Sequence, residues 1–164
     1  MIDEEYPSYI RELEHLLISL FRSMKEQHVQ DAAELKLSMP QFVCLWVISR
    51  MGKFKMSDLA IYLALSYASA TNLINRLVDS GLVNRYDDPD DRRVVIVELS
   101  DKGKEITSLI RQKHLKRLME NCEKLSQDEK DSMLKGLSTL TNVVVRKEDS
   151  TVDKKCRIME EFLE

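Results

Sequence analysis

The pattern of apolar and polar residues predicts a mostly helical chain with one short β-hairpin. From Tyr9 to Glu34, apolar residues recur every three or four positions, which is typical of an amphipathic helix. Ser38 and Gln41 then form a capping-box pattern, and the helix that they begin is predicted to run to about Met51. We expect this second helix to be buried because its apolar residues leave little polar surface: Phe42, Val43, Leu45, Trp46 and Ile48.

Two short helices are predicted next, and their spacing is that of a helix-turn-helix. Ser57 and Asp58 are expected to cap the first, and Ser66 the second, which runs to about Ser80 and is ended by Gly81. The second helix has an apolar stripe that we expect to be buried: Ala70, Leu73, Ile74 and Leu77. Its opposite face and its first turn then present small polar side chains and one cation: Ser66, Ala68, Ser69, Thr71, Asn72, Asn75 and Arg76.

A β-hairpin is predicted to follow this helix. Its strands are 82–86 and 94–99, and an aspartate-rich turn between them ends in Arg92 and Arg93. A helix-turn-helix followed by a hairpin with a basic tip is typical of a winged helix that binds DNA. In this hypothesis, one or both arginines enter a narrow minor groove, whose negative potential attracts a guanidinium. Asp87, Asp88 and Asp90 suit turn positions, and Asp91 is expected to accept backbone N–H bonds and to brace a neighbouring arginine.

Two long helices are predicted after the hairpin. Ser100 is expected to cap the first, and a capping box formed by Ser126 and Glu129 begins the second, which continues through Val144. The sequence therefore predicts a mainly α protein, of class α+β, in four parts. These are an N-terminal dimerisation helix (1–36), a winged helix-turn-helix with a two-stranded wing (37–100), C-terminal dimerisation helices (101–146) and a C-terminal extension with a weak helical pattern (147–164).

Charge narrows the DNA-binding hypothesis to a few residues. The 164-residue chain has a net charge of −3, and residues 50–104 carry a small positive excess of nine Lys and Arg over eight Asp and Glu. A few placed arginines must therefore make most of the contacts with DNA. The longest unbroken apolar run, 42–48, is far shorter than the ~20 residues of a membrane span, and the acidic N-terminus lacks a signal-peptide pattern. We expect a cytoplasmic protein that does not contact membranes.

The order of these elements resembles the MarR (multiple antibiotic resistance regulator) family over roughly residues 10–145. The most specific match is Asp88-Pro-Asp-Asp-Arg-Arg93, followed by Leu99-Ser-Asp-Lys-Gly103. The resemblance also rests on residues at the recognition helix and the strand after it: Leu73, Arg76, Leu77, Gly81, Leu82 and Arg85. It implies a homodimeric transcriptional regulator, expected to be a repressor, that binds a palindromic operator. The recognition helices would enter major grooves, and the wings would enter adjacent minor grooves.

The resemblance also implies a pocket for a small effector that releases the protein from DNA. Phe21, Met24 and Trp46 are candidates to line it, although core packing is the simpler role for each. Their apolar character favours a hydrophobic or phenolic effector. On the DNA side, Asn72 and Asn75 are candidates for adenine edges and Arg76 for a phosphate or a guanine. Ser69 and Thr71 suit phosphates or sugars. A solvated helix face is the alternative for both asparagines.

Other functions have less support in the sequence. A winged helix that binds a protein partner instead of DNA remains an alternative, because the net charge is negative. We expect no enzymatic activity and no cofactor, because the sequence has no nucleotide-binding glycine loop and no nucleophile-base signature. Three scattered cysteines (Cys44, Cys122 and Cys156) and three dispersed histidines match neither a disulfide framework nor a metal site.

Overall fold

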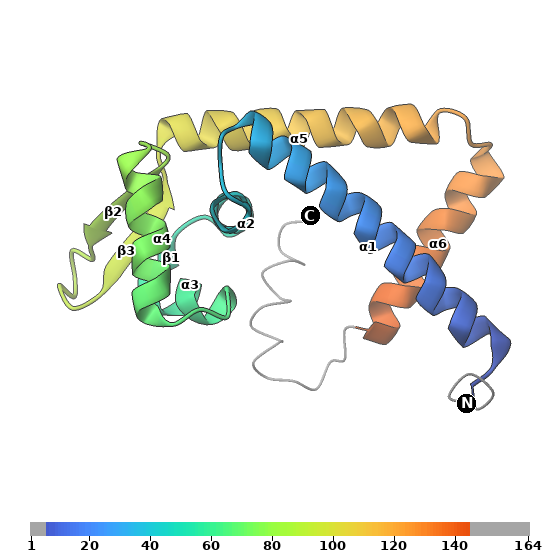
Figure 1. Ribbon diagram of the computed structural model, residues 1–164, viewed down its shortest axis with the longest axis horizontal. Coiled ribbons are helices and arrows are strands. Elements are labelled where there is room, and N and C mark those ends of the chain that lie inside the picture. Colours follow the sequence, from blue (N-terminus) through green and yellow to red (C-terminus); the bar gives the residue numbers. More distant parts are fainter. Residues whose placement is uncertain (1–5, 145–164) are drawn as a thin grey trace. The chain divides into compact units, whose positions relative to one another are not determined.

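A computed structural model of the chain describes residues 6–144 (Figure 1). The chain divides into two units, Met1–Val43 and Cys44–Glu164, and each is described by itself. The predicted short helix within 147–164 lies outside the described residues, as does Cys156. None of the helices in the described range is both long enough and apolar enough to cross a membrane.

The first predicted helix is confirmed as α1, Ser8–Glu34. It ends in a Schellman motif, in which Lys36 adopts a left-handed backbone with φ of 56°. The Lys36 and Leu37 N–H groups donate to the carbonyl oxygens of Ala33 and Ala32, at 3.0 and 2.9 Å. The carbonyl groups at the end of this helix are thus paired without a glycine.

Helix α2, Met39–Met51, begins as predicted but is not buried all round. The Ser38 N–H donates to Gln41 Oε1 at 2.9 Å, as expected for the capping box. Phe42, Leu45 and Ile48 are buried, whereas Val43 and Trp46 are 40% and 43% exposed. The prediction was wrong for these two because they share one face of the helix, three residues apart, while the buried residues occupy the other side.

The helix-turn-helix is formed by α3, Met56–Tyr62, and α4, Tyr67–Asp79. Helix α3 starts one residue before Ser57, so the predicted cap at Ser57 and Asp58 is wrong. The Ser57 hydroxyl instead donates to the Asp58 carboxylate at 3.3 Å. Ala64, with φ of 53°, closes the turn as the Leu65 N–H donates to the Ala60 carbonyl at 2.9 Å. Ser66 caps α4 by accepting the Ser69 N–H at 3.2 Å, as predicted.

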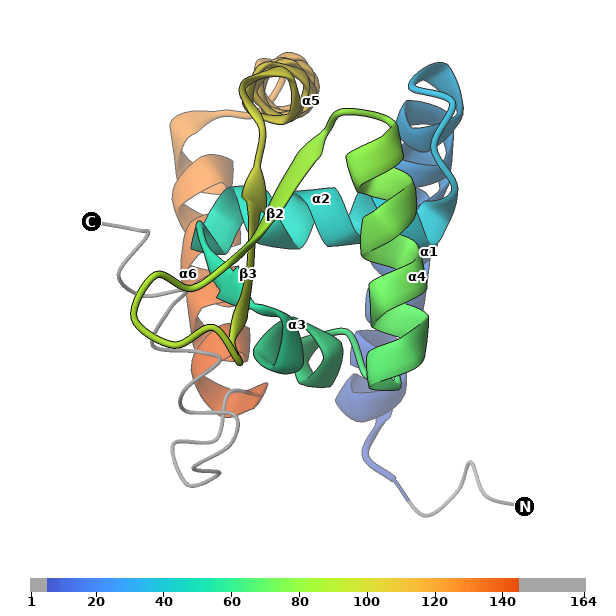
Figure 2. The same ribbon diagram turned by 90° about the vertical axis from the view of Figure 1, so that its left-hand side faces the viewer.

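The apolar stripe predicted for α4 is buried as expected: Ala70, Leu73, Ile74 and Leu77. Gly81 then ends the helix with φ of 70° and starts a sheet. The hairpin strands are β2, Val83–Asp87, and β3, Val95–Leu99. They run antiparallel to each other and are joined by the wing turn (Figure 2). A third strand that the sequence pattern did not reveal, β1 (Phe54–Lys55), pairs with the other edge of β3. Two residues are too short a segment for a period-two pattern to be recognised.

Both long C-terminal helices are confirmed as α5, Asp101–Cys122, and α6, Gln127–Val144. Ser100 caps α5 by accepting the Gly103 N–H at 3.0 Å. Ser126 and Glu129 form the predicted capping box, with the Ser126 N–H donating to Glu129 Oε2 at 2.8 Å. That bonding lowers the pKa of Glu129, because it favours the carboxylate. Within the described residues, α6 has no buried side chain.

Candidate DNA-binding surface

Helix α4 presents the polar face that the sequence predicts. Ala68, Ser69, Asn72, Asn75 and Arg76 are exposed, and Thr71 is half-buried. The Ser66 hydroxyl donates to Ser69 Oγ at 2.9 Å, and Thr71 Oγ1 donates to the Tyr67 carbonyl at 2.8 Å. The hydroxyl groups of Ser66 and Thr71 therefore bond within the helix and its cap, and the longer side chains of Asn72 and Arg76 extend from the exposed face.

The wing turn is held by the side chains of Asp88 and Asp91, whereas Asp87, predicted to be a turn residue, is the last residue of β2 because its backbone pairs with Val95. Asp88 Oδ1 accepts the Asp90 N–H at 2.9 Å, and Asp91 Oδ1 accepts the Arg93 N–H at 3.0 Å. The Val94 N–H donates to the Asp91 carbonyl at 2.8 Å, which closes the turn at the start of β3. These bonds fix the backbone on both sides of Arg92. The side chains of Arg92 and Arg93 are exposed, so the turn presents two cations on a loop whose backbone is held by hydrogen bonds.

A hydrogen bond that sequence reasoning did not predict joins the wing sheet to α4. Arg85 Nη1 donates to Asn75 Oδ1 at 2.9 Å. Arg85 pairs with the buried Val97 in the sheet register, and it lies two residues after the buried Val83. Alternation along a strand therefore places Arg85 on the side of β2 that carries the buried residues. That alternation was the available signal, but a sequence pattern does not specify which α4 residue the arginine meets.

The end of α4 and the start of α5 are bonded to each other. Ser100 Oγ donates to the Gly81 carbonyl at 2.7 Å, and Lys102 Nζ donates to the Ser80 carbonyl at 3.0 Å. Gly103 packs so closely that an added methyl group would overlap the Leu82 carbonyl oxygen. The direction of α4 is thus tied to the first turn of α5.

The other side of the sheet carries a separate cluster. Lys53 Nζ lies 3.2 Å from Glu98 Oε2 and 5.8 Å from the centre of the Tyr86 ring. Hydrogen bonding to Tyr86, and then to Glu98, raises the pKa of Lys53. Lys53 precedes β1, Glu98 lies on β3 and Tyr86 lies on β2. Their contacts therefore connect the start of β1 with the other two strands of the sheet.

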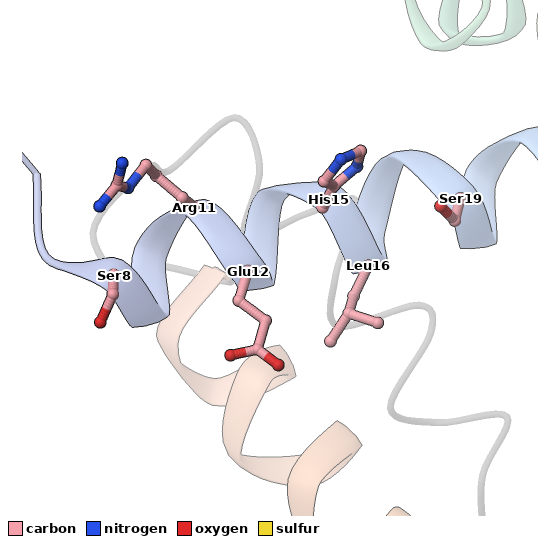
Figure 3. Close-up of a pocket in the computed structure, with 6 residues that line it drawn as sticks. All are labelled: Ser8, Arg11, Glu12, His15, Leu16 and Ser19. Carbon is pink, nitrogen blue, oxygen red and sulfur yellow. The ribbon is translucent and has the colours of Figure 1, made fainter. Parts of the chain in front are cut away.

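The three residues suggested for an effector pocket are all partly exposed. Phe21 and Met24 lie on α1, and Trp46 lies on α2 with the Arg50 guanidinium 5.3 Å from its ring centre. A separate hollow lies along α1, lined by Ser8, Arg11, Glu12, His15, Leu16 and Ser19 (Figure 3). It includes none of the three. A single exposed helix supplies all six lining residues, so the hollow does not identify a ligand.

Two of the three cysteines lie in the described range. Cys44 is fully buried, and burial raises the pKa of its thiol to about 12. A protonated thiol is a poor nucleophile and a poor metal ligand. Cys122 is half-buried on α5.

Comparison with known proteins supplies the family. The MarR family model matches residues 37–95. Over 135 residues the chain is 35% identical to YfiV of Bacillus subtilis, an uncharacterized HTH-type transcriptional regulator, covering 82% of this chain and 84% of YfiV. The chain belongs to the MarR family. The predicted resemblance is confirmed, and the chain is a winged helix-turn-helix DNA-binding regulator of transcription.

Two further comparisons concern the fold and a named transcriptional repressor. The structure of a MarR family protein from Bacillus stearothermophilus superimposes with a TM-score of 0.76 at 25% identity, covering 84% of this chain and 96% of that one. NicR of Pseudomonas putida, an HTH-type transcriptional repressor, is 33% identical over 89 residues, or 54% of this chain and 56% of NicR.

Proposed function

We propose that the protein is a homodimeric repressor that binds a palindromic operator and leaves it when a small apolar or phenolic effector binds. The observation that carries the DNA-binding part is the pairing of α4 with the wing. The exposed polar face of α4 and the two exposed arginines of the wing turn belong to one lobe, and the Arg85–Asn75 bond joins α4 to β2, the first strand of the wing. A repressor role agrees with the name of the relative NicR. We also propose a cytoplasmic location, because the named relatives come from bacteria, in which DNA lies in the cytoplasm.

Some of the proposed contacts position the protein on the DNA, and others recognise individual bases. Arg92 and Arg93 enter the minor groove, where a guanidinium gains affinity without reading many bases. Asn72, Asn75 and Arg76 face base edges in the major groove. Ser66, Ala68, Ser69 and Thr71 lie against the sugar-phosphate backbone, close to the start of α4, where the helix dipole favours a phosphate.

The dimer proposal rests on apolar side chains that the long helices leave exposed. On α5 and α6 these include Leu109, Leu115, Leu118, Met119, Leu134 and Leu137, and on α1 they include Leu16, Ile18 and Phe21. Exposed apolar patches of this kind mark association surfaces. A second copy would cover them and would place two recognition helices about one helical turn of DNA apart.

The release proposal uses the bonded junction between α4 and α5. Because Ser100, Lys102 and Gly103 hold the end of α4, a change in the direction of α5 would carry the recognition helix with it. An effector acts only through its different affinities for the two arrangements. Trp46, whose ring lies beside the Arg50 guanidinium, suits an aromatic or phenolic effector. Phe21 and Met24 remain candidates from the family resemblance.

The wing assignment is tested by replacing both tip arginines. The Arg92→Ala, Arg93→Ala double variant is expected to weaken operator binding by a few kcal/mol per dimer, at ~1 to 3 kcal/mol per contact. The measurement is a gel-shift titration with duplexes selected by the full chain, repeated at several salt concentrations. Wild-type affinity should fall steeply as salt rises.

A matched variant controls for the loss of charge. Lys124→Ala with Lys135→Ala removes two exposed cations from the region after the wing, and its affinity should stay close to that of the wild type. Equal affinities for the wing variant and the wild type would contradict the wing assignment. A dimer that binds no duplex at low salt, but that retains a protein partner, would instead support a protein-binding adaptor.

A further inference from the structure

We infer that Arg85 is a positioning residue that makes Asn75 a hydrogen-bond donor to DNA and thereby favours guanine over adenine at one operator position. The inference rests on the proposed role of α4 in the major groove. It starts from the 2.9 Å bond between Arg85 Nη1 and Asn75 Oδ1.

The chemistry of the two side chains fixes the orientation of the amide. An asparagine amide has an acceptor end and a donor end, and a free amide can turn either end outward. A guanidinium has only N–H donors, so the amide must present its oxygen to Arg85. The Asn75 Nδ2 group, with two N–H donors, therefore points away from Arg85.

The sheet holds Arg85 in place for this role. Arg85 lies in the middle of β2, paired in register with Val97, whose side chain is fully buried in the core. Asn75 lies on the exposed face of α4, between the buried Ile74 and the exposed Arg76. Both backbones are thus part of the packed lobe, and only the two side-chain ends are free to adjust.

The surroundings of the amide then select the base. Bidentate pairing with adenine needs Asn75 Oδ1 to accept from the adenine amino group while Nδ2 donates to N7. In this structure the Arg85 guanidinium already uses one of the two lone pairs of that oxygen, and a guanidinium offers only donors. An adenine amino group would meet further donors there, whereas guanine presents two acceptors, N7 and O6, to Nδ2 and the guanidinium. The adenine contact suggested by the sequence alone therefore gives way to guanine at Asn75, and Asn72 is unaffected.

The experiment measures base preference and uses duplexes selected by the full chain from a random library. Kd is measured for all four base pairs at each half-site position, for the wild type and for Asn75→Ala, Arg85→Met and the double variant. The position read by Asn75 is the one whose preference changes in Asn75→Ala. At that position the wild type should prefer guanine to adenine by roughly tenfold, the scale of one good base contact. Arg85→Met should lose that preference, and the double variant should lose no more.

The control and the overturning results follow from the same measurements. Arg111→Met, the same change at an exposed arginine of α5, should retain the preference. Thermal melting should show that Arg85→Met folds, since its side chain is exposed. The inference is overturned if the wild type prefers adenine at that position or if Asn75→Ala changes no position. It also fails if Arg85→Met weakens all duplexes equally and lowers the salt slope by about 1, which is the behaviour of a phosphate contact. A wild type that binds no duplex would refute the proposed function itself.

Discussion

The winged-helix lobe and the two helices that follow it differ in where they place their apolar residues. In the lobe, residues 44–103, large side chains such as Leu45, Ile48, Met56 and Ile74 are fully buried. In the following segment, residues 104–144, no described residue is buried, although leucines and methionines recur along both helices. The lobe is stabilised by its own core. The long helices have apolar surface that their own packing does not cover.

This difference separates two kinds of helix in one chain. Helix α4 has a buried apolar stripe and an exposed polar face, which fits the DNA contact proposed for it. Helix α6 exposes Met133, Leu134 and Leu137, which fits the proposed apolar contact with a second copy. An exposed leucine gains about 1.5 to 3 kcal/mol when it is fully buried. The same chain thus exposes hydrogen-bonding groups on α4 and apolar area on α6.

The largest expected change in stability is that of Ile74→Ala in the lobe core, which is compared with Leu134→Ala at an exposed position of α6. Ile74→Ala should lower the free energy of unfolding of the lobe by about 3 kcal/mol, because it leaves a cavity under α4. Leu134→Ala should leave the lobe intact and weaken self-association, because Leu134 is 63% exposed. Hydrogen exchange of lobe amides and sedimentation equilibrium separate the two effects. If both variants lowered the hydrogen-exchange protection of the lobe amides equally, the lobe would not be stabilised separately from the helices that follow it.

The next effect compares two glycines within helices. Gly103→Ala should destabilise the protein by about 2 kcal/mol, because the new methyl group overlaps the Leu82 carbonyl and must displace α5 from the end of α4. Gly136→Ala on α6 meets no described atom within 4 Å and should stabilise its helix by roughly 0.5 to 1 kcal/mol. Thermal unfolding of both variants gives the comparison. A neutral Gly103→Ala would show that α4 and α5 are not rigidly joined.

The smallest effect concerns the turn of the helix-turn-helix. Ala64→Gly should raise the free energy of unfolding slightly, by a few tenths of a kcal/mol, because it relieves the left-handed backbone at the cost of chain entropy. Ala68→Gly, in the first turn of α4 and exposed, should lower it by up to about 1 kcal/mol. Chemical denaturation measures the free energy of unfolding of each variant and shows whether it rises or falls. A destabilising Ala64→Gly would mean that the entropy term outweighs the strain.

The sequence predicted the elements well wherever side-chain periodicity carries the information. The stripe on α4, the caps at Ser66 and Ser100 and the capping box at Ser126 all appear as expected. Each of these depends on residues within about one or two turns of helix, and such local spacing can be read directly from a sequence. The resemblance of the wing motif to the MarR family predicted a DNA-binding regulator, which the comparisons confirm.

The failures have a common physical reason, which is that tertiary neighbours decided them. Trp46 is apolar like the core residues, but among the described residues it lies on the exposed side of α2 with Val43. Strand β1 exists because β3 offers it an edge, and two residues carry no pattern of their own. The partner of Asn75 is ten residues away, on another element, so no local rule could name it.

The burial of Cys44 has a practical consequence for measuring how the lobe opens. Its thiol is fully enclosed and stays protonated at neutral pH, because burial raises its pKa to about 12. A thiol reagent can therefore reach it only when the lobe core separates. With the other two cysteines replaced by serine, the labelling rate at this one position counts those opening events in native buffer, with no denaturant added.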